Sequence, residues 1–155
     1  MPTRNGSRRI VVGIDGSQPS QAALDWAVRE AAATGGEVDA VIAFDSGLAW
    51  IDVGSEYQAR IIEHAAAQAR DELHRVINGL DPAVPVHPLV VEGQAATVLV
   101  ELARNAELLV VGTRGRGGFA GLLLGSVSQR CTERSPCPVV VVPTMEGAHD
   151  ASSTG

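Results

Sequence analysis

The sequence predicts an α/β fold: a single domain with a doubly wound, five-stranded parallel sheet and four helices. Three observations predict this fold. Short apolar runs alternate with longer segments whose apolar residues recur at helical spacing. The 155 residues match the usual size of one domain, and no linker or internal repeat divides them. In such sheets helices cover both faces, and ligands bind beyond the carboxyl ends of the strands.

The first half of the chain predicts two strands and two helices. We expect strands at residues 10–14 and 38–44, because both runs are apolar and rich in branched residues. Ser17 can cap a first helix that carries Pro19 in its first turn and ends at Gly35 and Gly36. A long loop, residues 45–54 with Trp50, leads to a second helix over residues 56–77.

The second half predicts three strands and two helices. Two prolines make residues 84–91 an expected edge strand, and apolar spacing predicts a helix over 95–105. Residues 108–111 form an apolar strand expected to be buried on both faces. A Gly-rich loop, a short helix and a last strand at 139–142 follow. We expect a flexible N-terminus at residues 1–8, one domain at 9–143 and a disordered tail at 144–155.

All twelve basic residues are Arg, and the chain contains no Lys. A P-loop lysine and a lysine Schiff base are therefore excluded. The net charge is −6, yet the segment from Gly112 to Val142 holds four Arg against one Glu, a local balance of +3. An acidic chain with one basic segment argues against a nucleic-acid or membrane binder and is compatible with a site for a small anion.

The cysteine count and the hydropathy pattern predict a reduced cytoplasmic protein. The two Cys, Cys131 and Cys137, are too few for a disulfide framework and are not spaced as C-x-x-C. No signal-peptide core follows Arg8 and Arg9, and no stretch approaches the ~18 apolar residues of a membrane span.

The segment from Gly112 to Ser128 is the one that predicts chemistry. Its glycines let backbone N–H groups approach an anion closely, and residues 125–128 open a helix whose first turn offers free N–H groups and two hydroxyls. Arginine side chains in the loop can add positive charge. The alternative interpretation is a flexible surface loop with solvated arginines. The candidate phosphate-binding residues are Gly112, Thr113, Arg114, Gly115, Arg116, Gly117, Gly118, Gly125, Ser126, Val127 and Ser128.

Two general nucleotide motifs fit this segment poorly. The P-loop pattern fails because it requires a lysine. Gly115, Gly117 and Ala120 satisfy the loose dinucleotide pattern G-x-G-x-x-[GA], but they follow the fourth strand and lack an acidic residue about 20 positions on.

A third pattern fits much better. Gly112-x2-Gly115-x9-Gly125-Ser126 resembles the G-x2-G-x9-G-[ST] signature of the ATP-binding branch of the universal stress protein family. The resemblance extends over roughly residues 9–143, including the opening IVVGIDGS, the strand LLVVG and the closing CPVVVV. It implies a Rossmann-like fold of the adenine nucleotide alpha hydrolase type, with strand order 3-2-1-4-5.

The resemblance also implies ATP as the ligand, with Mg²⁺, held between the first and fourth strands. Gly13, Ile14 and Asp15 would line the adenine and ribose side, Ala43 would pass backbone hydrogen bonds to adenine, and Val91 would pack near the base. Gly112 and Gly115 would give room for ribose and phosphates, and residues 125–128 would bind phosphate oxygens. Two alternatives stay open: Asp15 as a plain turn or cap residue, and Ala43 as plain core. A phosphate role for Arg114 and Arg116 is an electrostatic inference.

No catalytic constellation is visible in the sequence. His64 and His74 lie ten positions apart on one predicted helix and share no face, and Ser126 and Ser128 lack a recognisable His partner. We therefore expect an ATP-dependent stress-response switch with slow or absent hydrolysis. A regulator that binds cyclic AMP or another adenine nucleotide is the alternative, and an enzyme of related fold is a third. The resemblance implies a homodimer through Val139–Val142, an apolar edge that would otherwise be a liability.

Overall fold

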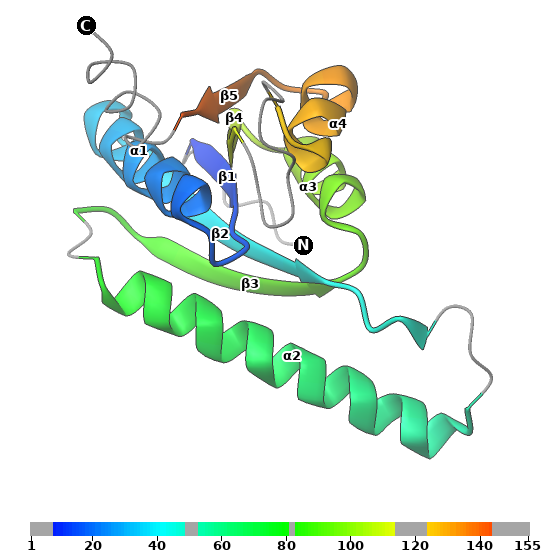
Figure 1. Ribbon diagram of the computed structural model, residues 1–155. Helices are drawn as coiled ribbons and strands as arrows, with labels where there is room; N and C mark the ends of the chain where they lie inside the picture. The colour runs from blue at the N-terminus through cyan, green and yellow to red at the C-terminus, as the bar shows by residue number, and fades with distance from the viewer. Residues whose placement is uncertain (1–7, 49–52, 81–82, 114–123, 144–155) are drawn as a thin grey trace, which may run out of the picture.

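The computed structural model describes residues 8–48, 53–80, 83–113 and 124–143, and its sheet has the predicted architecture. Five parallel strands lie in the order β3-β2-β1-β4-β5 (Figure 1). The elements are β1 (Arg9–Gly13), α1 (Gln18–Thr34), β2 (Glu37–Phe44), α2 (Ser55–Asn78), β3 (Val86–Glu92), α3 (Ala95–Ala103), β4 (Leu108–Gly112), α4 (Ser126–Arg134) and β5 (Val139–Val142). The predicted fold class and strand order are confirmed. Residues 1–7 of the predicted flexible N-terminus and residues 144–155, the predicted disordered tail, lie outside the described residues.

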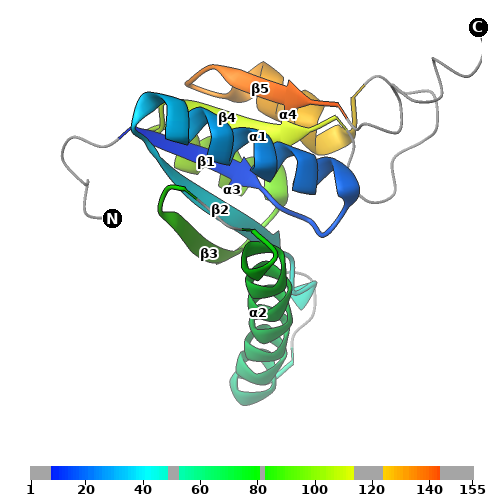
Figure 2. The same ribbon diagram turned by 90° about the vertical axis from the view of Figure 1, so that its left-hand side faces the viewer.

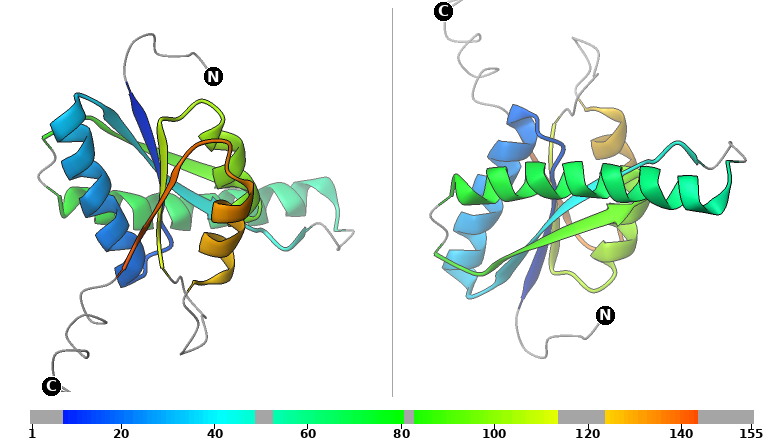
Figure 3. Two further views of the ribbon diagram at one scale, coloured as in Figure 1. Left: turned by 90° about the horizontal axis from the view of Figure 1, so that it is seen from above. Right: turned by 90° about the horizontal axis from the view of Figure 1, so that it is seen from below.

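Two apolar layers hold the helices against the sheet. On one face, Ile10 and Val12 of β1 pack with Leu24 of α1 and Leu73 of α2. On the other face, Val11 packs with residues of α3 and with Cys131 of α4. Figure 2 shows α1 crossing β1 and β4 with α3 behind the sheet, and Figure 3 shows α1 on one side and α3 and α4 on the other. The sheet is therefore doubly wound.

The first helix begins and ends as its sequence predicts. The Ser17 side chain accepts a hydrogen bond from the backbone N–H of Ser20, Pro19 lies in the first turn, and Gly35 ends the helix with a φ of 75°. Only glycine adopts this left-handed conformation without a steric cost.

The two edges of the sheet differ in their hydrogen-bonding capacity. Pro85 and Gly93, which flank β3, bond to β2, so by alternation the backbone groups of the even-numbered β3 residues face the free edge. Pro88 is one of these residues, and it has no N–H to offer there. The carbonyl of Pro138, just before β5, accepts from Leu109 of β4, and the carbonyl of Val142 in β5 accepts from Thr113, just after β4. By alternation, the N–H and C=O groups of Val139 and Val141 face outward. One edge is thus interrupted by proline and the other is open.

A buried ion pair joins the amino ends of β1 and β2. Arg9 donates from Nε to Asp39 Oδ2 at 2.8 Å and from a terminal nitrogen to the same oxygen. The Asp39 and Arg9 side chains are 6% and 15% exposed, so the carboxylate depends on Arg9 for its solvation. In the part of the chain that the structure describes, no helix has both the length and the apolar character to cross a membrane.

Candidate functional site

A cleft opens at the carboxyl ends of β1, β2 and β4, where the strand order reverses. Its lining combines strand ends with the beginnings of α1, α3 and α4. The lining residues are Gly13, Ile14, Asp15, Ser20, Val41, Ala43, Ala95, Leu99, Val111, Gly112, Val127 and Ser128. The cavity measures about 60 Å³, less than the ~300 Å³ or more of a site that encloses a small molecule. It can therefore enclose only part of such a ligand, and the rest has to lie over its rim.

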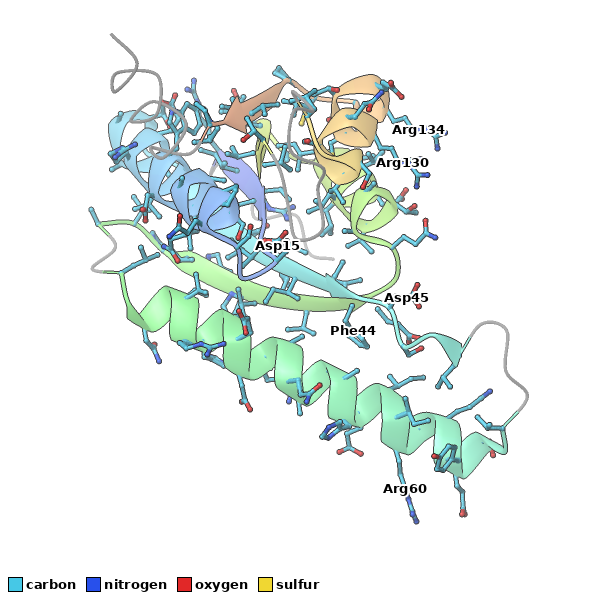
Figure 4. The ribbon with its side chains drawn as sticks, viewed as in Figure 1. Asp15, Phe44, Asp45, Arg60, Arg130 and Arg134 are labelled. Atoms are coloured by element: carbon cyan, nitrogen blue, oxygen red, sulfur yellow. The ribbon has the colours of Figure 1, made fainter. Side chains whose placement is uncertain are left out.

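The turn from β1 to α1 forms one rim of the cleft and is held by its own side chains. The exposed Asp15 carboxylate accepts a 2.9 Å hydrogen bond from the Ser17 N–H and another from the Ser17 hydroxyl. The buried Ser20 hydroxyl accepts from the Asp15 N–H at 3.3 Å and donates to the Ser17 carbonyl at 3.0 Å. These hydrogen bonds hold Asp15 in the turn that follows β1 (Figure 4).

The passage from β4 to α4 forms the opposite rim. The Thr113 carbonyl accepts a 2.7 Å bond from the Gly125 N–H and a 3.0 Å bond from the Ser128 hydroxyl. Thr113 is itself tied to the sheet, because its N–H donates to Val142 at 3.1 Å. The first turn of α4 starts there, with Gly125 buried and Ser126 exposed. The N–H groups of such a first turn have no partner within their helix and favour anions.

Two glycines in the cleft are closely packed against other parts of the protein. A Cβ atom at Gly13 would lie 2.7 Å from Leu99 Cδ1, and one at Gly112 would lie 2.6 Å from the Cβ and carbonyl carbon of Pro19. Leu99 is flexible at its end, but the Pro19 backbone is not. Gly112 therefore lets the start of α1 approach the end of β4, which is a packing role beside the expected one of making room for a ligand.

Two of the four arginines of the segment 112–142 are among the described residues. Arg130 and Arg134 are exposed on α4 and point away from the Asp15 turn (Figure 4). They are therefore on the outer side of this helix rather than in the cleft. Arg114 and Arg116, together with Gly115, Gly117 and Gly118, lie outside the described residues.

The structure brings together most of the predicted site residues that it describes. Gly13, Ile14, Asp15, Ala43, Gly112, Val127 and Ser128 line the cleft, while Thr113, Gly125 and Ser126 lie at its α4 rim. Val91 is half-buried against the core and is not among the lining residues. Five further residues line the cleft and were not predicted from the sequence: Ser20, Val41, Ala95, Leu99 and Val111. Ala95 and Leu99 were detectable in principle, since α3 follows β3 and begins at the same end of the sheet.

The described side chains offer no activated thiol beside the cleft. Burial raises the pKa of the Cys131 thiol to about 11, so it stays protonated at neutral pH and acts as a small apolar residue. Among the described residues, no group of three or more His, Cys, Asp or Glu is placed to hold a metal ion. His64 and His74 are exposed on α2.

Comparison with known sequences places the chain in a family. A sequence model of the universal stress protein family matches residues 6–143. A universal stress protein of Mycolicibacterium smegmatis is 39% identical over 137 residues, which cover 86% of this chain and 45% of that protein. The chain thus spans less than half of the length of this curated relative.

Solved structures agree with the sequence comparison. The universal stress protein UspA from Lactobacillus plantarum has a TM-score of 0.73 at 20% identity, covering 89% of this chain and 99% of its own. A universal stress protein in complex with cAMP has a TM-score of 0.58 at 31% identity, covering 90% of this chain and 98% of its own. With a family match over most of its length, the chain belongs to the universal stress protein family.

Proposed function

We propose that the chain binds an adenine nucleotide, ATP in the first place, in the cleft between β1 and β4. The main support for the proposal is that an apolar surface and a helix N-terminus meet in this cleft. Apolar walls from Val41, Ala43 and Leu99 suit a base, and the first turn of α4 beside them suits phosphate. The small cavity volume fits a ligand that the cleft encloses only in part, with its phosphates along the α4 rim.

In this proposal the bound nucleotide acts as a switch in a stress response, in the cytoplasm. Ser126 and Asp15 have the polar groups that would contact phosphate and ribose. No imidazole is found beside Ser126 among the described residues, and we therefore expect slow hydrolysis at most. Steady-state phosphate release with ATP and Mg²⁺ measures this directly, and multiple turnovers per second would contradict the switch role.

Cyclic AMP is a second candidate ligand, because the 31% identical solved structure is a complex with cAMP. The two ligands would contact the α4 rim differently. ATP presents a chain of phosphates to Gly125, Ser126 and Val127, whereas cyclic AMP presents one phosphate closed on its ribose. Displacement of one labelled nucleotide by ATP and by cyclic AMP gives the relative affinities of the two ligands.

The test of the site is the ATP affinity of the wild type, measured by titration calorimetry with and without Mg²⁺. Gly115→Ala and Ser126→Ala should each weaken ATP binding by about fivefold or more, as expected for loss of one charge-assisted contact or of close backbone approach. Ser135→Ala, at the far end of α4, is the matched control and should leave the affinity unchanged. Equal affinity in wild type, Gly115→Ala and Ser126→Ala would rule out this site.

We further propose a homodimer through the open edge of β5. The support is the outward direction of the backbone groups of Val139 and Val141, with four half-buried valines along a free edge. Strand pairing between two copies would satisfy these groups and cover the valines.

A further inference from the structure

Two of the three buried polar side chains among the described residues line the cleft. They are Ser20, 5% exposed, and Ser128, 2% exposed; the third, Asp39, is paired at the other end of the strands. Each cleft serine uses its hydroxyl on backbone groups of the protein. A hydroxyl has one proton to donate. The proton of the Ser128 hydroxyl is shared between two backbone carbonyls, so it is not free for a ligand.

We propose that Ser128 is a positioning residue that aims the first turn of α4 at the phosphates of a bound nucleotide, and this rests on the nucleotide function proposed above. Its hydroxyl donates to the Thr113 carbonyl and to the Gly125 carbonyl, both at 3.0 Å. The first bond joins α4 to the end of β4, and the second joins residue 128 to the residue that caps its own helix. The direction of the Ser126 and Val127 N–H groups is thereby fixed relative to the sheet.

The cap of α4 explains why this hydroxyl matters. Gly125 is the N-cap and has no side chain with which to hold the first turn, and no side-chain cap bond is present. Ser128 supplies a bond from inside the helix, and the Thr113 anchor is itself bound to Val142 of β5. A chain of hydrogen bonds therefore runs from the sheet to the phosphate end of the cleft.

Removal of the Ser128 hydroxyl should leave the fold intact. The Thr113 carbonyl keeps its 2.7 Å bond from Gly125, and the Gly125 carbonyl keeps its 2.9 Å bond from the Gln129 N–H. No buried acceptor is left unsatisfied, so the loss is one hydrogen bond of ordinary strength. The first turn is then held at one point instead of two.

Ser20 provides a matched control on the opposite rim. Its hydroxyl is similarly buried and also joins two backbone groups, but it holds the Asp15 turn rather than α4. Ser20→Ala therefore also removes one buried hydroxyl, but at the end of the cleft that would face the base and the ribose. Ser128→Ala should act on ligands with phosphates, and Ser20→Ala on all ligands alike.

The experiment compares the dissociation constants of ATP and adenosine for wild type, Ser128→Ala and Ser20→Ala in the full chain. Ser128→Ala should weaken ATP by about fivefold and adenosine by less than about twofold, whereas Ser20→Ala should weaken both by one common factor. An equal change of ATP and adenosine in Ser128→Ala, or no change in either, would overturn the positioning role. Failure of the wild type to bind ATP and adenosine would instead overturn the proposed nucleotide function, and the role of Ser128 with it.

Amide exchange in the wild type provides a second test that does not depend on the variant folding. The Gly125 N–H, which donates to Thr113, should be protected from exchange in the unliganded protein to a degree similar to the β4 amides. Exchange of Gly125 as fast as that of exposed Gly54 would show that α4 is not held to β4, and would refute the proposal.

Discussion

Gly112 at the end of β4 lies against Pro19 in the first turn of α1, with no room between them for a Cβ atom. Such an atom would be 2.6 Å from the Pro19 Cβ and 2.7 Å from its carbonyl oxygen. Since the contact is with backbone, relief would require α1 to move away from the sheet. Two elements that frame the cleft are thus in direct contact.

Gly112→Ala should therefore lower the free energy of unfolding by about 1–3 kcal/mol, the usual cost of overpacking. Urea denaturation measures it. Gly79→Ala is the control, because its added Cβ would meet neighbours no closer than 3.6 Å; it should change stability by less than about 0.5 kcal/mol. Similar stability of the two variants would show that α1 shifts without cost.

Alkaline pH should destabilise the protein chiefly through Cys131. Burial raises the pKa of this thiol from 9.0 to about 11 in the folded state, so the unfolded chain loses its proton first. Stability is therefore unaffected below pH 9 and falls as the pH rises from about 9 to 11. The chain has no Lys, so no lysine titrates in this range. Thermal unfolding between pH 7 and 11 should show a smaller decline in Cys131→Ala than in the wild type; parallel curves would contradict the assignment.

The two cysteines should also differ in reactivity. Cys131 is fully buried and has a raised pKa, whereas Cys137 is only partly buried. A thiol reagent at pH 8 should modify the native protein at Cys137 first, with Cys131 reacting only on unfolding. Mass spectrometry of the labelled peptides identifies the site, and early labelling of Cys131 would refute the buried position.

Loss of Arg9 should be costly because it leaves Asp39 buried without its partner. Arg9→Met should lower the free energy of unfolding by about 3 kcal/mol, since an unpaired buried carboxylate is poorly solvated. The double variant Arg9→Met, Asp39→Leu removes the charge as well and should recover most of the loss. A double variant that is no more stable than Arg9→Met would show that the pair is not the cause.

The proposed dimer can be tested at one backbone group. The Val141 N–H faces outward from β5, so Val141→Pro removes a donor at the free edge and none that binds β4. Light scattering should show a dimer for wild type and for the control Val141→Thr, and a monomer for Val141→Pro. A wild-type monomer at micromolar concentration, or a Val141→Pro dimer, would contradict pairing through β5.

The sequence predicted the fold well because its elements have strong local signals. Ser17, Pro19 and Gly35 mark the ends of α1 by cap chemistry. Pro85 just before β3 and Pro88 within it mark an edge strand. Helix and strand ends differ from the predicted ones by one or two residues, since propensity changes only gradually there.

The candidate site was predicted less completely, for physical reasons. Apolar residues such as Leu99 and Val111 look the same in a sequence whether they fill a core or line a cleft. The orientation of the Ser128 hydroxyl depends on Thr113, fifteen positions away, and no local pattern reports such a bond. The contact of Gly112 with Pro19 likewise exists only after β4 and α1 meet. The glycine signature marked the location of the site but could not show which of its residues serve packing.

The unequal edges of the sheet limit how copies of this chain can assemble. Pairing through β5 uses the one edge that has a continuous row of donors, while Pro88 interrupts the row on β3. Two chains joined by β5 would present a β3 edge at each outer side, and neither of these can easily accept another strand. In the proposed pair, growth by strand addition would therefore stop at two copies and would not proceed to a fibre.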